Sequence, residues 1–334
     1  MSGNFSADLF YDMFREAEIN ANAFEEWRDY REAVTRYIIE VSRPGSSVTI
    51  FGAGRCNDID LAELKEHFGT IRLVDFDKKA MRAAVEKYGI SAGTELVEHD
   101  LVGIKREWYI RFIELFHNEF MHLKTRQDCR MLSGELIELM RSAYGSIHEC
   151  CEAMHGNENM HESSEEMCVE NEGMHEGCEA THGKYAELQR TDYSVILGVH
   201  SQLNNSFSGI WNYVLAAVRG LGEIPGELAD GIKEIMIDIE NEQRRHTGDI
   251  VRRMNDLLLA TTQDSVFMGY ELYVTDNPQS PVEGAYQCSQ DFESREKMGK
   301  IRTESYIRTD WPLARDRRLV YNTVVGKFRK IDYC

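Results

Sequence analysis

The chain has 334 residues, 42% of them hydrophobic, with a formal net charge of -19 and eight cysteines. The charge disfavours nucleic-acid binding, because affinity for phosphates rests largely on Lys and Arg. No apolar run approaches the roughly 18 residues that span a bilayer, and the N-terminus lacks the basic-then-apolar order of a secretory signal. We therefore expect a cytoplasmic protein without nucleic-acid or membrane partners, whose cysteines are thiols or metal ligands rather than a disulfide framework.

The first 45 residues contain apolar and aromatic side chains at three- and four-residue steps, and the pattern stops at Pro44. This spacing predicts a helix. The simplest interpretation is a helical cap, residues 1–45, packed on the core. As an alternative, Tyr30 and Arg31 could reach over a bound ligand, where a guanidinium can pair with a carboxylate.

Residues 48–77 have the pattern of strand, glycine turn, helix, strand and acid. Glycines such as Gly52 and Gly54 at a strand-to-helix turn let a ligand approach the backbone, and the following helix can offer its N-terminal N–H groups to an anion. An acid at the tip of the second strand, here Asp75, can accept hydrogen bonds from ribose hydroxyls. The stretch therefore predicts a site for a nucleoside-bearing cofactor.

A second helix is predicted over residues 77–88 and a third strand over 94–97, followed by Asp100. In this position an acid can meet an adenine amino group, or it can simply cap the next segment; both interpretations stay open. Residues 102–147 then have the apolar spacing of one long or two shorter helices.

Residues 148–184 are unlike the rest of the chain, with ten Glu, five His and four Cys but almost no large apolar residue. Such a segment cannot bury enough apolar surface to offset its ordering entropy. It also contains a duplication, in which HECCEAMHG recurs as HEGCEATHG. Each copy has a His-x-x-Cys-x-x-x-His unit, whose side chains share one face if the unit is helical. The two units comprise His148, Cys151, His155, His175, Cys178 and His182.

These units predict a zinc or copper site, since imidazole and thiolate suit both metals and nearby methionines favour copper. The alternative is an inert acidic insertion in which ligand-type residues were merely copied. The segment has no C-x-x-C and no H-E-x-x-H, so a metalloprotease is excluded.

Ordered structure is predicted to resume with a near-continuous apolar strand over 193–199, which ends in His200 and Ser201. Helical spacing follows over 207–218 and again over 232–258, with a polar stretch inside the second segment. A fifth strand over 265–274 leads into a turn that contains Asp276.

The last part of the chain alternates polar and apolar residues over 300–309 and 319–328. This pattern predicts two further strands that close the sheet as a hairpin, joined by a polar loop over 310–318.

The alternation of strands and helices from residue 46 onward predicts an α/β fold, a Rossmann-like, doubly wound, mostly parallel seven-stranded sheet with helices on both faces. Its segments are a helical cap (1–45), the first part of the cofactor-binding α/β domain (46–147), the insertion (148–184) and the second part (185–334). Ligands of such sheets bind at the carboxyl ends of the strands.

Two cofactor classes compete for that edge. A dinucleotide needs G-x-G-x-x-G, and Asn57 occupies the place of the third glycine, so the pyrophosphate fingerprint is broken. The chain has no G-x-x-x-x-G-K-[ST], which excludes a P-loop.

FGAGRCNDIDL, LVDFD, EHDL and LGVHSQL, in this order, resemble the motifs of class I S-adenosylmethionine-dependent methyltransferases, in particular bacterial members with a GAG-x-C-N-D-L-like loop. The resemblance covers residues 46–101 and 192–328. It departs from the family where Cys56 replaces the last glycine of G-x-G-x-G, and in the insertion. It implies glycine-turn backbone near the methionine part of S-adenosylmethionine, Asp75 on the ribose, and Asp100 with Leu101 around the adenine. The cofactor-binding residues are expected to be Gly52, Ala53, Gly54, Asn57, Asp75, Phe76, Asp100, Leu101, His200 and Ser201.

We therefore predict a methyltransferase for an unidentified small-molecule acceptor, with S-adenosylmethionine as cofactor and zinc or copper as a further expected ligand of the insertion. If a general base is needed, His200 is the best-placed candidate, with Asp276 behind it, although a structural role for each is as reasonable. The alternatives are a non-catalytic metal-binding or sensing protein on the same fold and, less favoured, an NAD-dependent oxidoreductase. The sequence does not give the oligomeric state.

Overall fold

The protein is described from a computed structural model, which covers residues 6–16, 21–120, 122–155, 188–219, 226–314 and 319–331. Two compact units divide the chain. The sheet unit comprises Met13–Val102, Arg190–Gly209 and Gln243–Cys334, and the helical unit comprises Met1–Asp12, Gly103–Gln189 and Ile210–Glu242.

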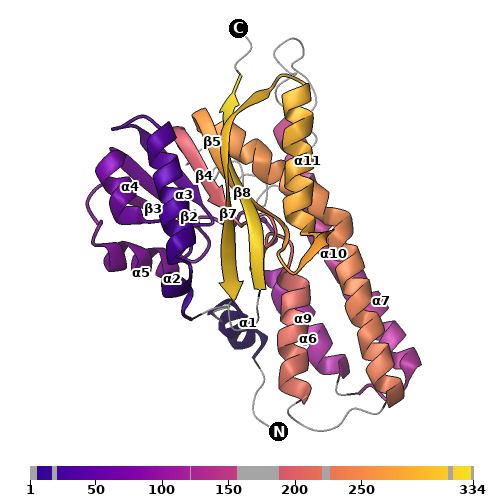
Figure 1. Ribbon diagram of the computed structural model, residues 1–334. Helices are drawn as coiled ribbons and strands as arrows, with labels where there is room; N and C mark the ends of the chain where they lie inside the picture. Colours follow the sequence, from indigo (N-terminus) through magenta and orange to yellow (C-terminus); the bar gives the residue numbers. More distant parts are fainter. Residues whose placement is uncertain are drawn as a thin grey trace, which may run out of the picture. The chain divides into compact units, whose positions relative to one another are not determined.

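The sheet has the strand order β3-β2-β1-β4-β5-β8-β7, and β6 pairs with β5 outside this path (Figure 1). The pairings from β3 to β5 are all parallel, whereas β8 runs antiparallel to both β5 and β7. The strands are β1 (Ser47–Phe51), β2 (Thr70–Asp75), β3 (Thr94–Glu98), β4 (Thr191–Leu197), β5 (Thr262–Val274), β6 (Asn277–Pro281), β7 (Ile301–Ala314) and β8 (Leu319–Lys330). The predicted mostly parallel, Rossmann-like sheet is confirmed, and its order departs from the 3-2-1-4-5-6 order of dinucleotide-binding sheets because β8 is inserted next to β5.

The pairing register brings the carboxyl ends of the parallel strands to the same level of the sheet. Phe51 of β1 pairs with Val74 of β2 and with Ile196 of β4, which in turn pairs with Met268 of β5. The chain order reverses between β1 and β4, and that is the point at which ligands of open α/β sheets bind.

Helices cover both faces of the sheet. On β5, Phe267 packs edge-on against Tyr37 of α3 (Arg28–Val41), while its neighbour Met268 contacts Cys288 of α11 (Glu283–Lys297). Successive strand residues point to opposite faces, so α3 and α11 lie on opposite sides. Helices α4 (Leu61–His67) and α5 (Lys78–Tyr88) share the α3 face.

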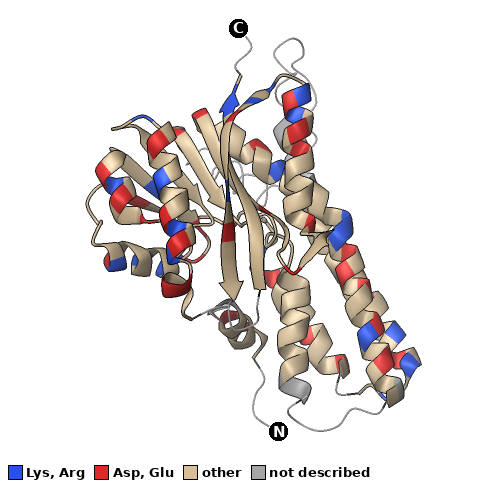
Figure 2. Ribbon diagram, in the orientation of Figure 1, with Lys and Arg blue, Asp and Glu red and all other residues tan. Residues whose placement is uncertain are grey.

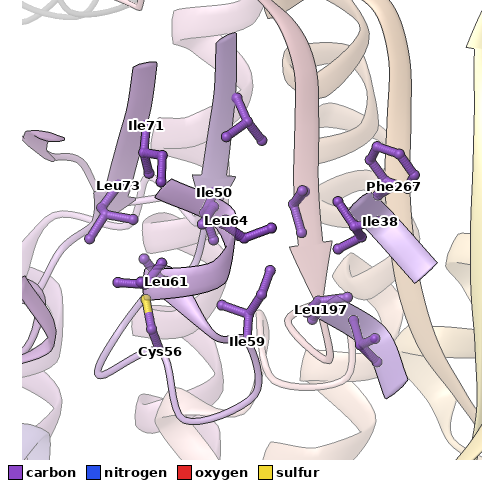
Figure 3. Packing of buried hydrophobic residues seen from close by; sticks show 14 of the residues in the cluster. Ile38, Ile50, Cys56, Ile59, Leu61, Leu64, Ile71, Leu73, Leu197 and Phe267 are labelled. Carbon is purple, nitrogen blue, oxygen red and sulfur yellow. The ribbon is translucent and has the colours of Figure 1, made fainter. Parts of the chain in front are cut away.

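The core on the α3 face consists of aliphatic and aromatic residues from the strands and from the three helices (Figure 3). Fully buried β1 and β2 side chains such as Ile50 and Leu73 meet Leu61 and Leu64 of α4. Burial of apolar surface contributes about 25 cal/mol per Å², so this core stabilises the part of the sheet that carries the glycine turn. Charged residues lie mainly on the helices (Figure 2).

The helical unit contains α6 (Arg106–Phe120), α7 (Arg126–His155) and the adjoining parts of α9 (Ser206–Arg219) and α10 (Gly226–Thr261). Phe116 of α6 packs edge-on against Trp211 of α9, with ring centroids 4.7 Å apart. Polar contacts join α7 to α10, including Arg141 with Glu242 at 3.0 Å. Among the helices that the structure describes, none is long and apolar enough to cross a membrane.

The N-terminal part is helical as predicted, in three pieces: α1 (Ala7–Glu16), α2 (Ala23–Glu26) and α3. The compact units group the chain differently from the four predicted segments, since residues 103–147 lie in the helical unit rather than with the sheet.

Two details of the sequence prediction were wrong. The polar loop expected over 310–318 begins later, because β7 continues through Trp311 and Pro312 to Ala314. Proline is tolerated there since β7 is an edge strand. Helix α11 was not predicted, because its buried positions include small residues such as Ala285 and Cys288, which give only a weak apolar pattern.

Candidate functional site

The glycine turn after β1 lies at the tip of the strand, where Gly52 and Ala53 N–H groups both donate to Val74 O. Gly52 and Gly54 have φ values of 65° and 47°. A Cβ at Gly52 would lie 2.4 Å from Cγ2 of Val199 on the β4 tip, so this glycine serves packing between the two tips. Above Gly54, by contrast, a Cβ would meet nothing within 4 Å. The open approach to the backbone is therefore at Gly54.

The loop after the turn is held by cationic and hydroxyl groups from neighbouring helices. Lys87 of α5 donates to Arg55 O and Asn57 Oδ1 at 3.1 and 3.0 Å, and Arg31 of α3 donates to Asn57 O at 3.1 Å. The Tyr88 hydroxyl lies 3.0 Å from two further carbonyl oxygens of the loop, those of Cys56 and Ile59, and its single O–H is shared between them. Asn57 thus binds the protein's own side chains, and Arg31 clamps this loop rather than reaching across it.

Cys56 lies where the motif of the resembled family has its last glycine, and it has a φ of 48°, the left-handed conformation. This conformation costs a non-glycine residue roughly 1–2 kcal/mol. The side chain is buried in the core shown in Figure 3, next to Leu61. Burial of the thiol therefore offsets part of the backbone strain, and burial also raises its pKa well above the usual value.

Helix α4 does not offer a free N-terminus to the ligand edge, contrary to the expectation from the sequence. It begins at Leu61, well beyond the glycine turn, and Asp60 caps it by accepting from the N–H groups of Ala62 and Glu63 at 2.9 and 3.1 Å. A carboxylate in this place occupies the donors that would bind a phosphate. The edge therefore lacks the helix-terminal phosphate site of dinucleotide-binding folds.

Asp75 lies at the β2 tip and is only 6% exposed. Its Oδ2 accepts from Gly54 N at 2.9 Å and its Oδ1 from Asp77 N at 2.8 Å. Asp75 thus holds the glycine turn to the tip of β2, and each carboxylate oxygen can accept more than one hydrogen bond.

Phe76 follows Asp75 directly and is 42% exposed, an unusual environment for a phenyl ring. Asp100, two residues past β3, is exposed, and its Oδ1 accepts from Val102 N at 2.9 Å. This bond closes a local turn rather than capping α6, which begins at Arg106. Leu101 is half-buried beside it. These residues follow the tips of neighbouring parallel strands, in the places that the sequence predicted.

The side chain of His200 lies on the α10 and α11 side of the sheet, away from the residues at the tips of β1 and β2. Its ring is 1% exposed, and its Nε2 lies 2.9 Å from Oδ1 of Asn255 on α10, within the sheet unit. Burial lowers the pKa of His200 to about 4, although Asn255 and Asp291 oppose the shift. A neutral, enclosed imidazole on the α10 and α11 side favours a structural role.

Asp276 lies in the exposed turn between β5 and β6. Strand β5 continues to Val274, five residues beyond the level of Gly269, which pairs with Leu197 at the β4 tip. At about 3.3 Å per residue, this places Asp276 well beyond the row of strand tips. The structure therefore does not pair Asp276 with His200.

Sequence reasoning missed a second carboxylate, Glu271 of β5. It is 3% exposed, its Oε1 accepts from Ser201 Oγ at 2.6 Å, and its Oε2 is buried without a hydrogen-bond partner. Burial raises the pKa of Glu271, while the Ser201 hydroxyl and backbone N–H of Glu271 itself oppose the shift. Ser201 thus contacts Glu271, whereas the neighbouring His200 contacts Asn255.

Four aromatic side chains, three of them in contact with Trp311, form a group near Glu271 that we call the aromatic cluster. Trp311 stacks on Tyr30 with ring centroids 5.6 Å apart and meets Trp27 edge-on at 5.0 Å. It also packs against Tyr321, with centroids 6.2 Å apart. The buried indole N–H groups of both tryptophans have no hydrogen-bond partner. The members are Trp27, Tyr30, Trp311 and Tyr321.

The predicted metal ligands are not tested by the structure. The backbone of α7 is helical through His155, but the side chains of His148, Cys151 and His155 and all of residues 156–187 lie outside the described part of the chain. This also applies to His175, Cys178 and His182. Among the side chains that are described, no group of three His, Cys, Asp or Glu could hold a metal ion.

No protein-family model and no curated protein matches this chain. Among solved structures, it is similar to the N-methyltransferase NodS from Bradyrhizobium japonicum WM9 in complex with S-adenosyl-L-homocysteine, at 9% identity and a TM-score of 0.42, over 97% of this chain and 99% of that one. It is also similar to magnesium protoporphyrin IX methyltransferase (ChlM) from Synechocystis PCC 6803 with bound SAH, at 8% identity and a TM-score of 0.41, over 97% and 93% of the two chains. With TM-scores below 0.5, these likenesses do not establish a shared function, substrate or set of site residues.

Proposed function

We propose that this protein is an S-adenosylmethionine-dependent methyltransferase that acts on a small molecule. The observation that carries the proposal is the edge formed by the tips of β1 and β2. It combines open space above Gly54, the carboxylate of Asp75 and an α4 N-terminus already capped by Asp60. These features suit a nucleoside cofactor that brings a ribose but no phosphate. S-adenosylmethionine meets this requirement, whereas NAD and ATP carry phosphates.

In this proposal each residue at the edge has one task. Asp75 accepts hydrogen bonds from the ribose hydroxyls through its carboxylate, whose oxygens each have two lone pairs. The ring of Phe76 stacks on the adenine, and Asp100 and Leu101 border the adenine from the β3 side. The Gly54 backbone lies next to the methionine part, which its missing side chain leaves room to approach.

Methyl transfer is an in-line displacement, so positioning of the two reactants can supply a large share of the rate. When bound, S-adenosylmethionine would supply an activated methyl group on its sulfonium. The protein's contribution is to fix that group at the β1 and β4 tips, which Val199 and Gly52 hold together, and to exclude water there. His200 is not assigned a catalytic task, since its buried ring bonds to Asn255.

Phe76→Ala tests the proposal without disturbing the core, because the phenyl ring is exposed. Stacking of a base on an aromatic ring contributes roughly 1–3 kcal/mol, so the variant should bind S-adenosylmethionine about tenfold more weakly in calorimetric titration. Tyr306→Ala, which removes another exposed ring of the sheet unit, is the matched control and should bind like the wild type. Equal affinity of Phe76→Ala and wild type would remove Phe76 from the cofactor site, and absence of any binding by the wild type would sink the proposal.

The alternative functions make different predictions in the same titrations. A sensing protein on this fold would bind S-adenosylmethionine without releasing S-adenosylhomocysteine in the presence of any acceptor. An NAD-dependent oxidoreductase would bind NAD instead, although the capped α4 and Asn57 disfavour it.

A further inference from the structure

The carboxylate of Glu271 is buried in the sheet unit with one oxygen unsatisfied. An unpaired buried charge is costly, and native structures tolerate such a group mainly where it has a function. The causes that shift the pKa of Glu271 are burial and hydrogen bonds, and no cationic side chain of the described residues figures among them. The group therefore has an unfilled place for a positively charged or strongly donating partner.

The surroundings of this carboxylate are aromatic. A Cβ at Gly198 would lie 2.5 Å from the Trp311 ring and 3.5 Å from Glu271 Oε1. This Trp311 ring atom and Glu271 Oε1 are therefore at most about 6 Å apart, so that one bound cation can contact both the ring and the carboxylate. Tyr30 is buried beside Trp311, and its pKa is raised by burial first and then by the charges of Asp58 and Glu271. Two indole N–H groups without partners complete a cluster of unused polar atoms among aromatic faces.

We propose that Glu271 and the aromatic cluster bind the protonated amino group of the methyl acceptor, so that the acceptors are small primary or secondary amines. This inference rests on the proposed methyl-transfer function. A carboxylate together with aromatic faces recognises a cation by a charge-assisted hydrogen bond and by attraction to the ring quadrupoles. A neutral alcohol would gain only the hydrogen bond.

The position of Glu271 suits an acceptor next to the cofactor edge. Glu271 lies on β5, Ser201 and Val199 on the β4 tip, and Val199 packs against the Gly52 turn of β1. Adjacent strands are about 4.8 Å apart, so the tips of β1 and β5 are separated by roughly 10 Å. A cofactor at the β1 tip and an amine at Glu271 would meet over the β4 tip.

Glu271 would also prepare the nitrogen for reaction. An ammonium has no lone pair, so one N–H bond must break before the nitrogen can act as a nucleophile. In the proposed step the proton passes to Glu271 Oε2, an O–H bond forms, and the electron pair of the N–H bond stays on the nitrogen. The charges of ammonium and carboxylate are both neutralised, and burial, which raises the pKa of Glu271, favours the protonated acid. Ser201 is a positioning residue, because its hydroxyl holds Oε1, and Oε2 remains as the oxygen without a hydrogen-bond partner.

Calorimetric titration of the protein saturated with S-adenosylhomocysteine tests this inference. The probes are benzylamine, phenethylamine and n-hexylamine hydrochlorides, each compared with the corresponding alcohol. We expect at least one amine to bind in preference to its alcohol, and Glu271→Gln to weaken that amine about 100-fold, as expected when one member of a buried charge pair is removed. Ser201→Ala should weaken it less, while the affinity of Glu271→Gln for S-adenosylmethionine stays at the wild-type value.

Asp310→Asn is the matched control, since it neutralises an exposed carboxylate next to Trp311 and should leave amine affinity unchanged. Thermal unfolding checks that each variant is folded, and Ser201→Ala keeps the test available if Glu271→Gln does not fold. A protein that binds S-adenosylmethionine but shows no preference for any amine over its alcohol, or the same preference in Glu271→Gln, overturns this inference alone. Failure to bind S-adenosylmethionine overturns the proposed function, and this inference with it.

Discussion

The buried His200 makes a sharp prediction about stability against acid. Its folded-state pKa is about 4, against 6.5 for an exposed histidine. Because burial disfavours the charged imidazolium, the unfolded chain binds more protons than the folded chain between these two values. Burial of His200 therefore does not lower the free energy of unfolding above pH 6.5. As the pH falls from 6.5 to 4, the free energy of unfolding decreases. The full loss is about 3 kcal/mol, at 1.36 kcal/mol per pKa unit.

The variant that isolates this effect is His200→Gln, whose amide can still donate to Asn255 but does not titrate. Urea unfolding of both proteins at pH 7.5 and pH 5.0 gives four free energies of unfolding. On lowering the pH, the wild type should lose about 2 kcal/mol more than His200→Gln. Asp58 acts in the opposite sense, since burial raises its pKa to about 6 and its contribution to stability falls as the pH rises from 3.8 to 6. Because both proteins contain Asp58, the difference between them reports His200 alone.

The outcome that would refute this reasoning is the same pH dependence in both proteins. An imidazole that takes up a proton at no cost cannot be enclosed as described. The assignment of His200 to a structural role would then fall, and His200 would return as a candidate for the general base.

Three further changes have expected outcomes. Gly198→Ala should destabilise the protein by about 2–4 kcal/mol in urea unfolding, because its Cβ would lie 2.5 Å from the Trp311 ring and φ is 59°. Arg141→Met should cost about 2–3 kcal/mol in the same assay, because it removes the guanidinium from the Glu242 carboxylate, which is only 4% exposed. Replacing the six predicted His and Cys ligands of residues 148–184 by Ala should abolish zinc or copper binding by the full-length protein in calorimetry; unchanged affinity would contradict the metal prediction.

Each of the two stability predictions has a matched control. Gly248→Ala places a Cβ in open helix, 3.5 Å from the nearest atom, and should stabilise rather than destabilise α10. Arg252→Met removes an exposed ion pair with Asp249 and should cost under about 1 kcal/mol. If the variants and their controls had equal effects, the close contacts assigned to Trp311 and Glu242 would not exist.

The residues of the glycine turn could be predicted from the sequence because they are local. An apolar run, Gly52, Gly54 and then Asp75 after a second run determine a strand-turn-helix-strand unit in which the acid and the turn meet, and the Gly54 to Asp75 hydrogen bond is the result. The alternation of strands and helices along the sequence was likewise enough to predict a mostly parallel sheet. The expectation of a free N-terminus on α4 was wrong, and the local signal that it overlooked is Asp60 directly before the apolar Leu61 and Leu64, the position of an N-cap.

Glu271 could not be found in the same way. In the run SVFMGYELYV it looks like the outward-facing position of a half-buried strand, and its burial depends on Trp311, forty residues later, and on Tyr30 near the N-terminus. The one local signal was a glutamate two residues after Gly269 in an otherwise apolar strand. The failure to separate His200 from Ser201 has a similar cause, because adjacent residues after a strand point to opposite faces and the sequence does not say which face holds the ligand.

The most direct test of the account is a calorimetric titration of the wild-type protein with S-adenosylmethionine, NAD and ADP in parallel. S-adenosylmethionine should bind, whereas NAD and ADP should not, because Asp60 occupies the α4 donors that a phosphate would need. Binding of NAD or ADP as tight as that of S-adenosylmethionine, or no binding of S-adenosylmethionine, would contradict it.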